Sequence, residues 1–252
     1  MRKLFFSFFA LCLLLQSCTI MKDVTETYRM ATYDISLSQF ESPSNQKDQF
    51  SETIAKIEGE DGISKYSFED DNIQMIWYVG LEEFYFTIEN KTNHALKINW
   101  NEAVYVDIDK KAGKVIHSGV KYAQKNEAQV PSLIPKGSRL EDVVVPADNI
   151  YYSSYLNSWE TKQLFPTSFS SDEALNNAQK YEGKEISILL PITIENVQND
   201  YLFTFKVDKV VTSSKTETKQ VHDTDAEFAA TLWLGLGVTF ACVFLPIILL
   251  LP

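Results

Sequence analysis

Residues 186–207 read ISILLPITIENVQNDYLFTFKV, and this stretch decides the fold class. Apolar residues recur at every second position from Ile186 to Ile194, and again from Phe203 to Val207. A period of two is the pattern of a half-buried strand. The polar segment between the two runs, residues 196–200, reads as a five-residue connection. The sequence therefore predicts a β-hairpin here.

The same alternation runs through the middle of the chain from about residue 52. It places on one face Ile73, Met75, Trp77, Val79, Phe84, Phe86, Ile88, Leu96, Ile98, Trp100, Val104, Val106, Ile108, Ile116, Ser118, Val120 and Tyr122. One helix interrupts the pattern, with Ser170 and Glu173 as a capping box and Gly183 after its end. Many short strands without βαβ alternation predict a mostly β fold, an antiparallel immunoglobulin-like β-sandwich over residues 52–211 with one short helical insertion.

Composition excludes several classes of protein. The hydrophobic content of 45% argues against a wholly disordered chain. A net charge of −11 repels phosphate, so no nucleic-acid partner is expected. The three cysteines, Cys12, Cys18 and Cys242, all lie in or beside the apolar ends of the chain. The segment between those ends can therefore form no disulfide and holds no cysteine nucleophile.

The N-terminus reads as a secretory signal. Arg2 and Lys3 precede an apolar run that is too short to span a bilayer comfortably. The run ends in Leu15-Gln16-Ser17-Cys18, which resembles the lipobox of bacterial lipoprotein precursors. That resemblance implies a signal peptide of residues 1–17, cleavage before Cys18, and acylation of Cys18 with fatty acids such as palmitate. The alternative is an ordinary signal peptide with an incidental cysteine.

The C-terminus is apolar as well. Residues 228–251 carry no charge, and at about 1.5 Å per residue they would form a helix about 36 Å long, enough to cross a hydrocarbon core of about 30 Å. We therefore expect a C-terminal transmembrane helix there, after an acidic linker over residues 212–227. A signal peptide with an apolar C-terminus is also the outline of a GPI-anchored precursor, with Ser213-Ser214 as the attachment site.

A resemblance covers roughly residues 60–211. The segments Phe84–Thr92 and Ile134–Ser138, with the closing hairpin, resemble immunoglobulin-like domains of uncharacterised envelope lipoproteins of bacteria. The resemblance concerns the fold and carries over no functional residues. Residues 18–51 are interpreted as the lipidated Cys18 and a tether, in which Tyr28–Leu37 could add an edge strand.

No catalytic or metal-binding motif stands out. The chain has no G-x-S-x-G nucleophile elbow, and His94, His117 and His222 do not have the spacing of a zinc site. We therefore expect no catalytic residue, no metal and no cofactor.

Residues 149–159 are the most suggestive stretch for binding. Asn and Ser residues lie beside the four aromatic residues Tyr151, Tyr152, Tyr155 and Trp159. This combination of flat apolar area and polar groups suits a sugar-binding or protein-binding surface. The alternative is a strand and loop whose rings pack over the edge of the sandwich.

These observations together predict an envelope lipoprotein of a bacterial cell. Its extracytoplasmic domain would be a noncatalytic binding or assembly module, held to membrane lipid through Cys18 and residues 228–251. Its partner would be a membrane protein or a glycan. The alternative is an envelope glycan hydrolase that uses carboxylates from distant loops.

Overall fold

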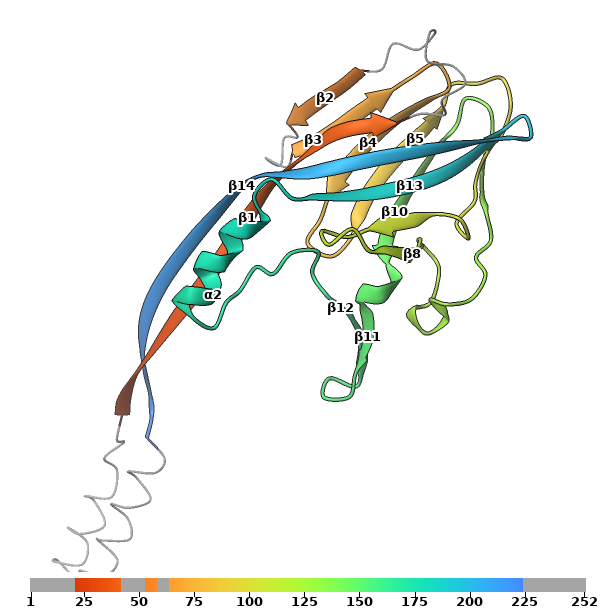
Figure 1. Ribbon diagram of the computed structural model, residues 1–252. Coiled ribbons are helices and arrows are strands. Elements are labelled where there is room, and N and C mark those ends of the chain that lie inside the picture. The colour runs from red at the N-terminus through yellow and green to blue at the C-terminus, as the bar shows by residue number, and fades with distance from the viewer. Residues whose placement is uncertain (1–20, 42–52, 59–63, 224–252) are drawn as a thin grey trace, which may run out of the picture. The chain divides into compact units, whose positions relative to one another are not determined.

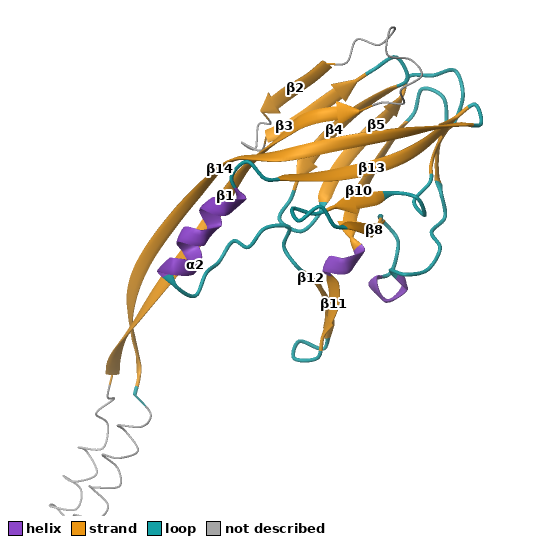
Figure 2. Cartoon of the chain, viewed as in Figure 1, coloured by secondary structure: helices purple, strands orange, loops and turns teal. Residues whose placement is uncertain are grey.

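The computed structural model describes residues 21–41, 53–58 and 64–223. These residues are mostly antiparallel strands with one short α-helix (Figure 2), as the sequence predicts. They divide into two compact units. The larger unit comprises Arg29–Ser213, and the described part of the smaller unit comprises residues 21–28 and 214–223.

The strands are short except for the first and the last. Their bounds are β1 Met21–Glu41, β2 Thr53–Glu58, β3 Ser64–Glu69, β4 Ile73–Val79, β5 Phe84–Asn90, β6 Leu96–Ile98, β7 Val104–Val106, β8 Ala112–Ile116, β9 Ser132–Ile134, β10 Arg139–Pro146, β11 Ile150–Ser153, β12 Ser158–Thr161, β13 Glu185–Ile194 and β14 Val197–His222. The 3₁₀ turns are η2 Tyr122–Gln124, η3 Ala147–Asn149 and η4 Ala178–Tyr181.

The strands of the larger unit form two layers (Figure 1). The first sheet has the order β2-β3-β4-β5-β10, and every neighbouring pair in it is antiparallel. The second sheet is built on β13, which pairs with β14, β6 and β7. Strands β8 and β10 join the layers through two residue pairs, Ile116 with Val145 and Val115 with Pro146.

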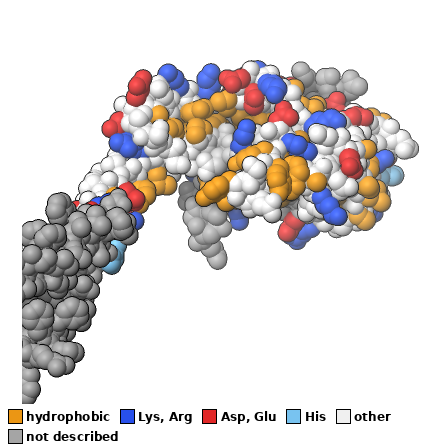
Figure 3. All heavy atoms as spheres, turned by 90° about the horizontal axis from the view of Figure 1, so that it is seen from below, with side chains coloured by type: hydrophobic (Ala, Val, Ile, Leu, Met, Phe, Trp, Pro, Cys, Tyr) orange, Lys and Arg blue, Asp and Glu red, His pale blue; other side chains and the backbone are white. Residues whose placement is uncertain are grey.

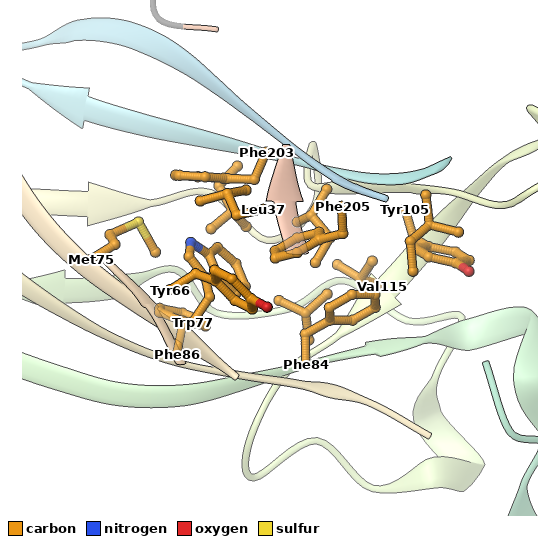
Figure 4. Packing of buried hydrophobic residues seen from close by; sticks show 14 of the residues in the cluster. Leu37, Tyr66, Met75, Trp77, Phe84, Phe86, Tyr105, Val115, Phe203 and Phe205 are labelled. Carbon is orange, nitrogen blue, oxygen red and sulfur yellow. The ribbon is translucent and has the colours of Figure 1, made fainter. Parts of the chain in front are cut away.

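Aromatic side chains fill the space between the layers (Figure 4). The ring centroids of Trp77 in β4 and Phe203 in β14 lie 4.9 Å apart, and those of Phe84 in β5 and Phe205 in β14 lie 5.3 Å apart. All four side chains are fully buried. Burial of large rings from both layers makes this contact a source of hydrophobic stabilisation between the layers.

The predicted hairpin forms, but its connection is shorter than expected. Ile194 pairs with Val197, so the turn consists of Glu195 and Asn196 alone. Both residues have positive φ, 49° and 68°, as the type I′ turn of a two-residue hairpin requires. Backbone pairing with β13 extends through residues 198–200, which the sequence predicts to be part of the connection.

Strand β7 faces the opposite way from the prediction. The alternation Val104, Val106, Ile108 placed these residues in the core, but Tyr105 is the buried residue of β7. The reason is the register, which sets Tyr105 opposite the fully buried Ile188, and directly paired residues lie on the same face of a sheet. The stripe predicted over Ile116–Tyr122 also ends early, because β8 stops at Ile116.

The helix begins one residue later than predicted. α2 spans Asp172–Asn177, and its N-cap is Ser171, whose hydroxyl accepts a hydrogen bond from the Ala174 amide. Leu175 is buried on its inner side. Gly183, at a φ of 79°, follows the 3₁₀ turn η4 that extends the helix.

The smaller unit is a two-stranded ribbon of residues 21–28 and 214–222, which belong to β1 and β14. Threonine hydroxyls face each other across it, Thr25 with Thr218 and Thr27 with Thr216, each at 3.2 Å. The described part of the tether predicted over 18–51, residues 21–41, is therefore strand, and so are residues 212–222 of the linker predicted over 212–227. Ser213 and Ser214 also lie within β14. Polar strands of this kind lack the apolar alternation by which a strand is recognised.

The predicted fold class is wrong in two respects. In the first sheet the four consecutive strands β2–β5 are neighbours, unlike the ABED order of immunoglobulin domains; short connections keep consecutive strands side by side. The described residues also contain no helix long and apolar enough to cross a membrane. Their α-helix has six residues, about 9 Å in length. The predicted transmembrane segment, residues 228–251, lies outside the described residues.

Candidate functional site

The aromatic stretch singled out in the sequence forms a separate hairpin of β11 and β12 at one end of the larger unit (Figure 1). Tyr151 pairs with Glu160, and Tyr152 pairs with Trp159. The turn between the strands comprises residues 154–157, with Asn157 at a positive φ of 52°. Asn and Gly are the residues that best tolerate this conformation.

The base of the hairpin is fixed to the sandwich. Ile150 is buried in a small cluster with Ile116, Val145 and Ala147. The Lys125 ammonium group donates hydrogen bonds to the carbonyl oxygens of Ala147 and Ile150, the first at 2.8 Å. These contacts hold the first residue of β11 from two sides.

The four predicted binding residues are exposed. The exposed fractions are 43% for Tyr151, 48% for Tyr152, 94% for Tyr155 and 40% for Trp159. None of these rings is part of a buried core cluster. Seen from below, exposed hydrophobic side chains form bands on the molecular surface (Figure 3).

The structure distributes these four rings over both faces and the tip of the hairpin. Successive residues of a strand point to opposite faces, so Tyr151 and Tyr152 diverge. Tyr152 meets Trp159 edge to face, with ring centroids 5.6 Å apart, and donates a 2.6 Å hydrogen bond from its hydroxyl to Asn157 Oδ1. Tyr155 stands at the tip beside the exposed Leu156.

The face of the hairpin that carries Tyr151 has a charged side chain beside the ring. The Lys162 ammonium group lies 5.8 Å from the centroid of the Tyr151 ring, within the range of a cation–π contact. Residues 149–159 have no charged side chain, and Glu160 is the charged residue of β12. An uncharged aromatic tip with polar hydroxyls is inexpensive to desolvate when a partner covers it.

The remaining predictions about sites concern residues elsewhere. Cys18, the predicted acylation site, lies outside the described residues. Within the described ranges, no group of three or more histidine, cysteine or acidic side chains is placed to hold a metal ion. His117 is part of a structural cluster in which its Nδ1 lies 3.1 Å from Asp142 Oδ2, and its ring stacks on Trp100.

A cavity that the sequence did not indicate lies near the base of the hairpin. Its volume is about 300 Å³, and Tyr105, Asp107, Lys114, Asp148 and Gln163 are among its lining residues. Burial, with the nearby charge of Asp107 as the smaller cause, raises the pKa of Tyr105 above its ordinary value. The lining residues come from three segments of the chain, 105–114, 146–149 and 163–164, so no single local motif could have joined them.

Comparison with known proteins adds no relative: no family model, curated protein or solved structure matches this chain.

Proposed function

We propose that this chain is a bacterial envelope lipoprotein, acylated at Cys18, whose β domain is a noncatalytic binding module on the extracytoplasmic side of a membrane. The lipobox Leu15–Cys18 supports acylation and localisation. One acyl chain binds a bilayer only marginally, whereas the two or three chains of a mature lipoprotein anchor it firmly.

The hairpin β11–β12 is the contact surface of this module. The observation that carries the proposal is that Tyr152, Tyr155 and Trp159 are exposed on a hairpin whose base is buried and hydrogen-bonded. Tyr and Trp offer large contact areas at a low cost in side-chain entropy, and they are enriched among residues that dominate binding energy. Rings at the tip and on both faces suit insertion into a cleft of a protein partner in the envelope.

Site-specific photo-crosslinking tests this function. The photoreactive residue p-benzoylphenylalanine replaces Tyr155 in one variant and Val130 in another, and both chains are irradiated in intact cells. Val130 is the matched control because it is also apolar, exposed at 80% and on a loop. We expect position 155 to give a discrete protein adduct that position 130 does not give.

The dependence of the adduct on the neighbouring rings makes the test specific. Adding Tyr152→Ser and Trp159→Ser to the position-155 variant should reduce the adduct at least fivefold, since both rings would lie in the same contact. Equal adducts at the two positions would contradict the proposal, as would an adduct that survives the two substitutions or consists only of lipid.

A second candidate function, glycan hydrolysis, is favoured by one observation. Asp107 and Asp148 line the same cavity, and glycosidases use two carboxylates that flank the scissile bond. Asp148 also forms an ion pair with Lys111 at 3.1 Å. The test is release of new reducing ends from envelope glycan strands. A hydrolase would lose this activity in both Asp107→Asn and Asp148→Asn, and no release from the wild-type chain excludes the hydrolase.

A further inference from the structure

The cavity near the hairpin base is a partly open pocket. It is lined by residues of β7, the turn at residues 107–111, β8, η3 and residues 163–164. Its volume of about 300 Å³ lies at the lower end of the range for small-molecule sites. It does not include the exposed rings of the hairpin, so an inference about it stands independently of the partner contact proposed above.

Tyr105 is the residue that sets this cavity apart. Its side chain is only 7% exposed, and its ring packs in the core with its centroid 5.9 Å from that of Phe84. The hydroxyl points away from the cluster of core rings (Figure 4), and the residue lines the cavity. Among the described residues, none forms a hydrogen bond with this hydroxyl. Since burial raises the pKa of Tyr105, the group stays protonated and able to donate.

Other side chains of the cavity also have unused hydrogen-bonding capacity. Asp107 Oδ1 accepts from the amides of Asp109 and Lys111, each at 2.9 Å, and Oδ2 has no partner within the described ranges. Gln163 Oε1 accepts from the amide and hydroxyl of Thr167, which leaves its Nε2 group free to donate. The walls therefore offer both donors and acceptors on side chains that are already held in place.

The charges of the lining residues balance. Lys111, Lys114, Asp107 and Asp148 all line the cavity, and Lys111 pairs with Asp148. Because Lys111 and Asp148 are largely exposed, water screens their charges, and the balanced set gives a charged ligand no net attraction. A neutral molecule with many hydroxyl groups needs no such attraction, because each hydroxyl both donates and accepts hydrogen bonds.

We propose that this cavity binds a neutral polyhydroxylated ligand, a single saccharide unit, with the Tyr105 hydroxyl at its floor and Asp107, Asp148 and Gln163 around its ring. The hydroxyl of Tyr105 donates to a ligand oxygen, and the carboxylates accept from ligand hydroxyls. The Ile108 and Leu164 side chains contribute the apolar part of the wall.

The experiment observes Tyr105 directly. The full-length chain is labelled with 3-fluorotyrosine and purified in a detergent without a sugar headgroup, and the Tyr105 signal is assigned in the ¹⁹F spectrum from Tyr105→Phe. The probes are the methyl glycosides of glucose, galactose and N-acetylglucosamine, with glucuronate and glucosamine as charged counterparts. We expect at least one neutral glycoside to shift the Tyr105 signal saturably, and neither charged sugar to bind more tightly.

Affinities measured by calorimetry complete the test. Tyr105→Phe keeps the ring in the core and removes only the hydroxyl, so affinity should fall about fivefold to tenfold, the effect of one hydrogen bond. Tyr85→Phe is the matched control, because its hydroxyl bonds to Glu83 at the surface, and affinity should not change. The proposal is overturned if no neutral glycoside shifts the signal, if a charged sugar binds more tightly, or if Tyr105→Phe binds as well as the wild type.

Discussion

The hydroxyl of Tyr201 in β14 donates a 3.1 Å hydrogen bond to Oδ2 of Asp70, and both side chains are buried. Asp70 follows β3 directly, so this bond links the loop of one sheet to a central strand of the other. The second carboxylate oxygen of Asp70, Oδ1, accepts hydrogen bonds from the amides of Asn72 and Ile73 at 2.8 and 2.7 Å. One carboxylate thus holds a tight turn and joins the two layers.

This arrangement predicts a pH dependence of stability. Burial raises the pKa of Asp70, although its hydrogen bonds and Lys91 lower it in part. The folded chain therefore binds this proton more tightly than the unfolded chain does. The contribution of Asp70 to the free energy of unfolding is largest below its ordinary pKa of about 3.9 and is lost as the pH rises through the raised value.

Asp70→Asn removes this titration and keeps an oxygen acceptor for the turn. We expect the variant to gain free energy of unfolding relative to the wild type as the pH rises from 4 to 7, measured by urea unfolding with tryptophan fluorescence. Asp71→Asn, at an exposed neighbouring position, should follow the wild type at every pH. Parallel curves for wild type and Asp70→Asn would refute the assignment.

Asn90 is predicted to be irreplaceable for stability. Its side chain is 1% exposed, and its Nδ2 group donates to the carbonyls of His94, Ile134 and Pro135. Asn90→Asp removes these donors and turns a carboxylate toward three carbonyl oxygens. We expect a loss of about 2–4 kcal/mol in the free energy of unfolding. Asn93→Asp at the exposed position nearby should change it by less than about 0.5 kcal/mol, and a similar loss in both would count against this role.

The Asp142 carboxylate is the second buried acid with a structural role. Oδ1 accepts from the amides of Ser118 and Val143, each at 2.8 Å, and Oδ2 contacts His117. Asp142→Ala leaves these donors without partners and should cost about 2–3 kcal/mol by urea unfolding. The adjacent Glu141 is exposed, so Glu141→Ala is the control and should be nearly neutral. If both substitutions lowered the free energy of unfolding equally, the loss would come from changing any residue of β10 and not from the buried hydrogen bonds of Asp142.

The turn between β13 and β14 offers a stabilising substitution. Glu195 adopts a φ of 49°, where Asn is more favourable than Glu. Its ion pair with His94 is exposed and contributes little. Glu195→Asn should raise the free energy of unfolding by about 0.5–1 kcal/mol. Glu195→Gln removes the charge but is as unfavourable as Glu at positive φ, so it should not raise the free energy of unfolding. A rise in Glu195→Gln would mean that loss of the charge, not the backbone conformation, stabilises the chain.

Acylation at Cys18 is tested by metabolic labelling with an alkyne analogue of palmitate. Wild type and Cys12→Ser should carry the label, because Cys12 lies within the segment that cleavage removes. Cys18→Ser should lose it and accumulate as the uncleaved precursor. A mature chain that retains Met1, by mass spectrometry, would contradict the lipobox prediction.

Strands with a strong apolar alternation could be predicted from the sequence, and those with a weak one could not. Ile73, Met75 and Trp77 are buried in β4 as predicted, because this face of β4 packs against the other layer, where the Trp77 ring contacts Phe203. Strand β7 has only three residues, and its orientation depends on its pairing with β13. The paired ends of β1 and β14 are polar, so a pattern of hydrophobicity cannot reveal them.

The candidate binding residues could be found locally, whereas their arrangement could not. A run of Tyr, Asn, Ser and Trp without charge is visible in one dimension, and all four rings are exposed. Their division between two faces depends on the pairing of Tyr152 with Trp159. The cavity of Tyr105 depends on contacts between distant segments, and a single sequence contains no record of such contacts.

The sequence by itself determined that this chain is mostly antiparallel β with a short helix, since side-chain period and turn residues are local properties. It also contains the lipobox motif on which the prediction of an acylated Cys18 rests. The tertiary structure alone decided the strand order, the inward face of β7, and the placement of Tyr105 at a cavity beside Asp107 and Asp148. The physical reason is that register and packing are fixed by the free energy of contacts between residues far apart in the chain, which no local pattern encodes.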